Sequence, residues 1–221
     1  MTKKSTAPRP TDPAPFADDD PRATFARAVA LGATVIDRVQ PGQLGLPTPC
    51  PEMDVRRLLG HLVMVLQRVA AAGRGQDPST WPGEVTGLAD DAWAAAWTEA
   101  AHEVRGAWTE DATLARDTVL PWATVTGEGA LRIYTNEVTV HTWDLARATG
   151  QEPEWDEAVL EVSLTTMQEA LPAAGRAESY EEAKAALPPG VPWADPFAPA
   201  VEVPEDAPLV DRLVAWNGRR P

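Results

Sequence analysis

Residues 55–72, VRRLLGHLVMVLQRVAAA, and residues 130–148, ALRIYTNEVTVHTWDLARA, decide the fold of this chain. Apolar side chains recur in both stretches every three or four residues, which predicts two long helices that each bury one face. Asp54 precedes the first stretch and suits an N-cap, and Gly150 follows the second where a C-terminal cap is expected. The buried face of the first helix is predicted to contain Leu58, Leu59, Leu62, Val65, Leu66 and Val69.

The same helical period extends over most of the remaining chain. We expect further helices from Pro21 to Pro41, over 88–108, 156–171, 179–187 and 209–216, with an extended or turn segment over 117–129. This pattern indicates an all-α fold. Its predicted organisation is a loose N-terminal tail over 1–20, a metal-binding helical bundle over 21–172, and a C-terminal extension over 173–221 packed on the bundle. A proline-rich extended strap is expected over 187–208.

The composition of the chain narrows the classes of function. Lys and Arg number 19 against 33 Asp and Glu, and the net charge of -14 would repel both a nucleic-acid backbone and an anionic membrane surface. The start of the chain has two lysines but no apolar segment typical of a secretory signal. The single cysteine, Cys50, cannot form an internal disulfide. These features predict a cytoplasmic protein that binds neither nucleic acid nor membrane.

A candidate metal site follows from the spacing of three side chains. Glu137 and His141 lie four residues apart, so they share one face of a helix and can reach the same ion. His61 lies within the apolar stripe of the other long helix and is expected to point inward as a third ligand. Two histidines and one carboxylate leave a position for water or substrate, which is typical of catalytic rather than closed structural sites. Zinc is the expected ion, and nickel, iron or manganese fit the same donors.

Three segments carry a resemblance to a known family: LPTPCPEMDVRRLLGHLV (46–63), EVTVHTWDLARATGQ (137–151) and FAPAVEVPEDAPLVDRLVAWNGRRP (197–221). They resemble metal-binding proteins of the mycothiol-dependent maleylpyruvate isomerase type, within the DinB-like superfamily. The resemblance implies an antiparallel four-helix bundle with additional C-terminal helices. It also implies a metal at one end, held by a histidine of the second helix and by an acid and a histidine of the fourth. His61, Glu137 and His141 occupy those positions.

The resemblance further implies that mycothiol is the co-substrate. A metal-bound thiolate would attack a small electrophilic molecule, and the protein would be an S-transferase or isomerase. Two alternatives remain at this stage: a metal-dependent hydrolase that uses bound water, and a non-catalytic module in which the ion only braces the bundle. The sequence identifies neither the electrophile nor the oligomeric state, which is expected to be a monomer or a homodimer.

Several other residues have both a functional and a structural interpretation. Asp144, one turn after His141, could orient a metal ligand or form a surface pair with Arg147. Arg56 and Arg57 could meet a thiol or anionic substrate, or lie on an exposed helix face. Cys50, between two prolines, is expected to fill a small apolar space, and His102 to lie on a solvated helix face. Trp143 and the other tryptophans are expected mainly in the core.

Overall fold

The computed structural model describes residues 16–120, 123–185 and 197–221. Most of these residues are helical, which confirms the predicted all-α class. The helices are α1 (Pro21–Ile36), α2 (Val55–Gly73), α3 (Trp93–Ala107), α4 (Ala112–Ala115), α5 (Gly127–Thr149), α6 (Glu157–Ala170), α7 (Arg176–Ala185) and α8 (Leu209–Trp216), with short 3₁₀ turns η1 (Pro41–Gln43) and η2 (Pro78–Thr80). Two short strands, β1 (Asp117–Leu120) and β2 (Ala123–Thr126), separate α4 from α5.

Capping residues set the ends of the two helices that carry the candidate site. The Asp54 carboxylate accepts a hydrogen bond from the backbone N–H of Arg57 at 2.9 Å, which confirms it as the N-cap of α2. The Thr126 hydroxyl accepts from the N–H of Gly129 at 3.1 Å and begins α5. Gly150 ends α5 in the left-handed conformation, with φ of 70°, as predicted. Capping residues next to each helix therefore determine where α2 begins and where α5 begins and ends.

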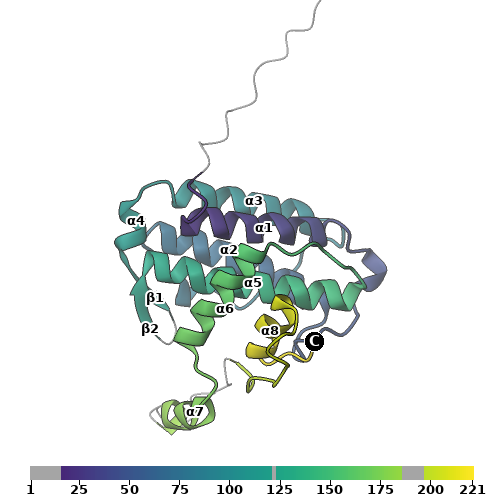
Figure 1. Ribbon diagram of the computed structural model, residues 1–221. Helices are drawn as coiled ribbons and strands as arrows, with labels where there is room; N and C mark the ends of the chain where they lie inside the picture. The colour runs from purple at the N-terminus through teal and green to yellow at the C-terminus, as the bar shows by residue number, and fades with distance from the viewer. Residues whose placement is uncertain (1–15, 121–122, 186–196) are drawn as a thin grey trace, which may run out of the picture.

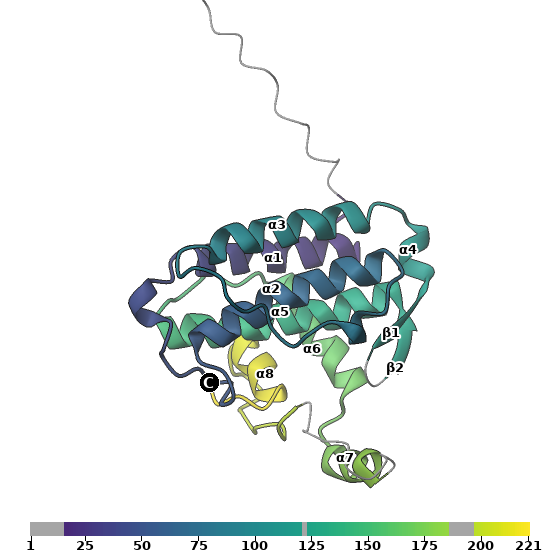
Figure 2. The same ribbon diagram turned by 180° about the vertical axis from the view of Figure 1, so that it is seen from behind.

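Four helices surround the main core. α2 packs against α3 and α5, and α1 packs against α5 and α3, so the order around the core is α1, α3, α2, α5. Figures 1 and 2 show these helices side by side from opposite faces. The predicted stripe of α2 is entirely buried, and burying its apolar surface supplies much of the driving force for packing the bundle. Other fully buried large side chains of the core are Trp97, Leu131, Leu145 and Val35.

The segment between α2 and α3 corrects one sequence expectation. The third helix was expected from Leu88, but α3 begins at Trp93. Gly87 has φ of 80°, which is outside helical geometry, and the preceding residues run back along α2. There the N–H of Val85 donates to the carbonyl of Gly60 at 3.0 Å. Loop residues 74–92 are thus packed against α2 rather than coiled into α3.

Two smaller expectations about element boundaries also change. Helix one ends at Ile36, before the predicted Pro41, and that proline begins the 3₁₀ turn η1 instead. The extended segment predicted near 117–129 is an antiparallel hairpin in which Asp117 pairs with Thr126. The residues at its tip, 121–122, lie outside the described residues.

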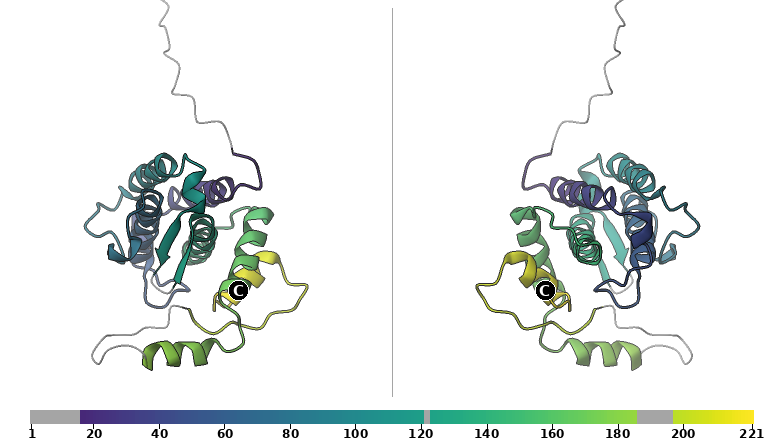
Figure 3. Two further views of the ribbon diagram at one scale, coloured as in Figure 1. Left: turned by 90° about the vertical axis from the view of Figure 1, so that its left-hand side faces the viewer. Right: turned by 90° about the vertical axis from the view of Figure 1, so that its right-hand side faces the viewer.

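The C-terminal helices cover the side of α5 that faces away from α2 and α3. α6 packs on α5, and α8 packs on α6 and α5, while α7 lies farther from the bundle (Figure 3). Asn217 follows α8 and exchanges two side-chain hydrogen bonds of 3.0 Å with Asn136 of α5, and both residues are buried. Buried Arg176 donates to the carbonyls of Leu171, Ala198 and Trp216 and so joins the ends of α6 and α8.

Residues 186–196 of the predicted strap lie outside the described part of the chain, and 197–208 form neither helix nor strand. The N-terminal tail expected over 1–20 is described only from Phe16. In the described part of the chain, no helix is both long and apolar enough to cross a membrane.

Candidate metal centre

Three side chains from two helices meet between α2 and α5. His61 extends from α2, and Glu137 and His141 extend from successive turns of α5. Nε2 of His61 lies 3.2 Å from Oε1 of Glu137, and the two imidazole rings meet edge to face with centroids 4.9 Å apart. One donor atom from each residue lies within 4.8 Å of the others. The structure thus brings together the three residues that the sequence singled out.

The loop between α2 and α3 determines which nitrogen of His61 faces this cluster. Nδ1 of His61 lies 2.9 Å from the carbonyl oxygen of Gly83. A carbonyl oxygen can only accept, so Nδ1 carries a proton and donates it, which leaves Nε2 directed at Glu137. Arg68 supports this loop by donating to the carbonyls of Trp81 and Pro82 at 3.3 and 2.7 Å.

Asp144 determines which ring nitrogen of His141 carries the proton. Nδ1 of His141 lies 3.0 Å from Oδ2 of Asp144, whose side chain is fully buried. The carboxylate also accepts two hydrogen bonds from the guanidinium of Arg219, at 2.9 and 3.2 Å. The surface pair between Asp144 and Arg147 is absent among the described residues, because Arg147 instead lies over the ring of Trp143. Asp144 therefore holds the proton of His141 on Nδ1 and directs Nε2 away from itself.

Arg219 is the residue of this cluster that sequence reasoning missed. It lies at the end of the chain, beyond α8, and 75 residues separate it from Asp144. The only sequence signal was its place in the C-terminal segment that carries the family resemblance. No periodicity or local spacing connects an arginine in that segment with a carboxylate on α5.

One donor separation of the cluster is compatible with two ligands of a shared divalent ion. Two ligand atoms that each lie about 2.1 Å from one ion at tetrahedral or octahedral angles are roughly 3.0–3.4 Å apart. The 3.2 Å separation between His61 Nε2 and Glu137 Oε1 falls in that range. The side chains of His61 and His141 are only 11% and 12% exposed, whereas Glu137 is 24% exposed, so the cluster is enclosed but open on the side of Glu137.

The electrostatics of the metal-free cluster favour one proton shared by His61 and Glu137. Burial lowers the pKa of His61, but the hydrogen bond and charge of Glu137 outweigh burial and raise it above its ordinary value. Burial alone would raise the pKa of Glu137, yet His61 holds it below the usual range. Burial lowers the pKa of His141 in spite of Asp144, so this imidazole is neutral at neutral pH. A cation would take the place of the proton on His61.

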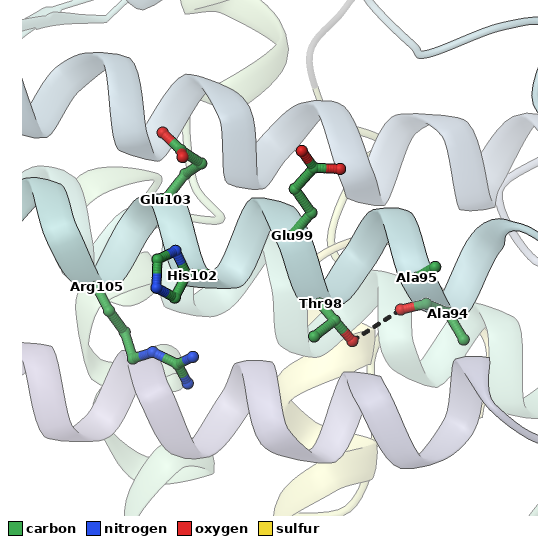
Figure 4. Close-up of a pocket in the computed structure, with 7 residues that line it drawn as sticks. All are labelled: Ala94, Ala95, Thr98, Glu99, His102, Glu103 and Arg105. Atoms are coloured by element: carbon green, nitrogen blue, oxygen red, sulfur yellow. Dashed lines mark hydrogen bonds between the residues drawn. The ribbon is translucent and has the colours of Figure 1, made fainter. Parts of the chain in front are cut away.

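The other sequence candidates lie outside this cluster. Arg56 and Arg57 are exposed on α2 and pair with Asp90 and Glu84, so their proposed contact with a thiol stays a prediction. His102 is exposed, as expected for a solvated helix face, and Figure 4 shows it on α3 beside other polar side chains.

Cys50 has different surroundings from those expected. It is half-buried, and its sulfur lies within 4.8 Å of ligand atoms of His141 and Asp144 rather than in an apolar space. Burial raises the pKa of the Cys50 thiol, which keeps it protonated at neutral pH.

The fold and this cluster define a mostly helical protein with an enclosed pair of histidines and a carboxylate between two core helices. The family model for the mycothiol maleylpyruvate isomerase N-terminal domain matches residues 10–146, more than half of the chain, and the chain belongs to this family. The matched range contains His61, Glu137, His141 and Asp144 but not Arg219.

Comparisons with individual proteins identify relatives in sequence and a shared fold. Two proteins from two strains of Mycobacterium tuberculosis, both described only as uncharacterized, are 32% identical over 90% of this chain and 98% of their own length. The crystal structure of the mycothiol-dependent maleylpyruvate isomerase superposes with a TM-score of 0.54 at 15% identity, covering 76% of this chain and 72% of that one. A mutant of that enzyme superposes equally well at 14% identity. At these identities the likeness shows a shared fold.

Proposed function

We propose that this protein is a metal-dependent enzyme in which mycothiol reacts with a small electrophile, giving either S-transfer or isomerisation. The observation that carries the proposal is the ligand set of His61, Glu137 and His141, in which one ligand atom of each residue lies within 4.8 Å of the others. Membership of the mycothiol maleylpyruvate isomerase N-terminal family supports a thiol as the co-substrate. The ion is proposed to be zinc, with nickel, iron and manganese as alternatives for these donors.

The residues in and around the cluster would have different roles. His61, Glu137 and His141 would hold the ion, which would lower the pKa of a bound thiol or water into the neutral range. The Gly83 carbonyl and the Asp144 carboxylate keep the protons of the two histidines on Nδ1. Arg219 balances the buried charge of Asp144. The apolar side chains of α2 and α5 limit access of water, and the partly exposed Glu137 marks the side where substrate would enter.

Metal analysis is the first test of this proposal. Elemental mass spectrometry is expected to find one divalent ion per chain in the wild type and none in His61→Ala or His141→Ala. His102→Ala is the matched control, because this third histidine is exposed and lies outside the cluster. Equal metal content in all three variants would contradict the site.

The thiol is tested separately by calorimetric titration with mycothiol. Binding is expected in the metal-loaded protein and not after chelation. Metal without thiol affinity would favour the hydrolase or the structural module. If mycothiol binds, isomerisation of maleylpyruvate and mycothiol transfer to small electrophiles become the activity assays.

A further inference from the structure

A second possible binding site lies between α1 and α3, away from the metal cluster. It is a groove of about 600 Å³, within the size range of small-molecule sites. Buried aromatic and aliphatic side chains form its floor, and none of the three metal-site residues lines it among the described residues. The floor consists of Phe25, Trp97, Val104, Trp108 and Leu131, and small side chains form the walls, namely Ala23, Ala26, Ala30 and Ala33 of α1 and Ala101 of α3.

α1 and α3 contact each other near both ends of the groove. At one end α1 passes close to α3 at Gly32, where a Cβ atom would lie 2.8 Å from Trp97. At the other end Arg22 donates to the carbonyl of Trp108 at 3.4 Å, and Phe16 stacks on the guanidinium of Arg22 at 4.0 Å. Between these ends the walls consist mostly of alanines, with Val29 and Thr98, and Arg27 and Arg105 lie at the rim, so side chains do not fill the space.

Of the three arginines that line the groove, two have acidic partners and one does not. Arg22 is paired with Asp20 and Asp111, and Arg27 is paired with Asp156 at 3.1 Å. Arg105 is exposed and has no hydrogen bond or ion pair in the described part of the chain.

Figure 4 shows that the Arg105 side chain extends from α3 toward α1, while Glu99 and Glu103 of the same helix point the other way. A guanidinium without an acidic partner beside an apolar groove attracts an anionic group.

We propose that this groove binds a small amphipathic carboxylate, with its aliphatic or aromatic body on the tryptophan floor and its carboxylate on Arg105. Transfer of the apolar body from water to the floor supplies most of the affinity, because the hydrophobic free energy grows with the apolar area that is buried. The guanidinium then selects an anionic head over a neutral one. This site is separate from the metal centre and does not rest on the proposed enzymatic function.

Calorimetric titration with dodecanoate, below its micelle concentration, tests the proposal on the full chain. Wild type is expected to bind one dodecanoate per chain. Ala30→Phe and Ala101→Phe fill the groove from opposite walls, and each is expected to weaken binding by at least about tenfold. Ala95→Phe is the matched control, because this exposed alanine of α3 lies outside the groove and should bind as wild type does.

Arg105→Gln tests how much the carboxylate head group contributes to binding. It is expected to weaken dodecanoate binding by about three- to tenfold while leaving dodecanol binding unchanged. Melting temperature and metal content check that each variant is folded. The proposal is overturned if wild type does not bind dodecanoate or if both filling variants bind it normally. It is also overturned if sedimentation shows a wild-type dimer that Ala30→Phe dissociates, since a second copy of the chain would then occupy the groove.

Discussion

Asp144 and Arg219 form a two-point ion pair, with Nη2 to Oδ2 at 2.9 Å and Nε to Oδ1 at 3.2 Å. The same Oδ2 accepts the hydrogen bond of His141. The end of the chain is thereby coupled to a candidate metal ligand on α5 through one carboxylate. A planar guanidinium suits this pairing because its two parallel N–H groups match the two carboxylate oxygens.

Replacing Arg219 is expected to weaken metal binding even though Arg219 is not a ligand. Arg219→Ala leaves the buried Asp144 carboxylate without its cation and frees it to turn away from His141. Loss of such an outer partner typically lowers metal affinity by about 10- to 100-fold. Competition with a fluorescent chelator measures the affinity, and Arg220→Ala, at the exposed neighbouring position, is the control. An unchanged affinity in Arg219→Ala would show that the ion pair only anchors the chain end.

Asp144 should make the protein more sensitive to acid. His141 and Arg219 outweigh burial and hold the pKa of Asp144 below its ordinary value. The resulting stability is therefore present above the ordinary pKa of aspartate, about 3.9, and is lost as the pH falls through the lower folded pKa.

Asp144→Asn removes this contribution at neutral pH, and we expect the free energy of unfolding to fall by about 2–4 kcal/mol. Urea titrations of the metal-free protein from pH 7 to pH 3 should show a smaller pH dependence in the variant. Asp90→Asn, which removes an exposed pair with Arg56, should change the curve little. Parallel curves for wild type and Asp144→Asn would contradict the assignment.

A glycine is expected to be required at position 60, because the loop between α2 and α3 lies directly against α2 there. A Cβ atom there would overlap the backbone carbonyl of Val85, and neither backbone can move without breaking the Val85-to-Gly60 hydrogen bond. Gly60→Ala should therefore displace the loop, remove the Gly83 acceptor from His61, and lower the free energy of unfolding by about 1–3 kcal/mol.

Chemical unfolding and metal titration of Gly60→Ala test both effects. Gly106→Ala on α3 is the matched control, since a Cβ atom there has no neighbour within 4 Å. This control is expected to be neutral or slightly stabilising because alanine favours a helix more than glycine does. A Gly60→Ala protein with wild-type stability and metal affinity would show that the loop adapts freely.

Lowering the pH should also release the metal, because protons compete with the ion for His61. Glu137 raises the pKa of His61 in the metal-free protein, so a proton competes with the ion already above the ordinary histidine pKa of about 6.5. Below the raised pKa the apparent affinity is expected to fall about tenfold for each pH unit. Zinc titrations between pH 5.5 and pH 8.5 measure this slope. His102→Ala should leave the slope unchanged, whereas a pH-independent affinity would exclude His61 as a ligand.

Much of the fold could be predicted because its signals are local. The N-cap at Asp54, the C-cap at Gly150 and the apolar stripe of α2 are each encoded within one or two helical turns. The start of α3 could not be predicted. Its helical sequence pattern begins at Leu88, but residues 74–92 form a loop that contacts Gly60 of α2, and the helix begins only at Trp93. A contact with another helix overrode the local propensity at that boundary.

The sequence by itself determined that Glu137 and His141 share a helix face and that His61 lies on an inward-facing stripe, because helical periodicity fixes both. Helical spacing also placed Asp144 one turn after His141, as a candidate to orient it. Only the tertiary structure decided that Gly83 orients His61, that Arg219 pairs with Asp144, and that a groove remains between α1 and α3. These features join residues far apart in the chain, and their distances depend on how whole helices and loops pack. No local pattern of residues encodes such distances, so they emerge only when the chain is folded.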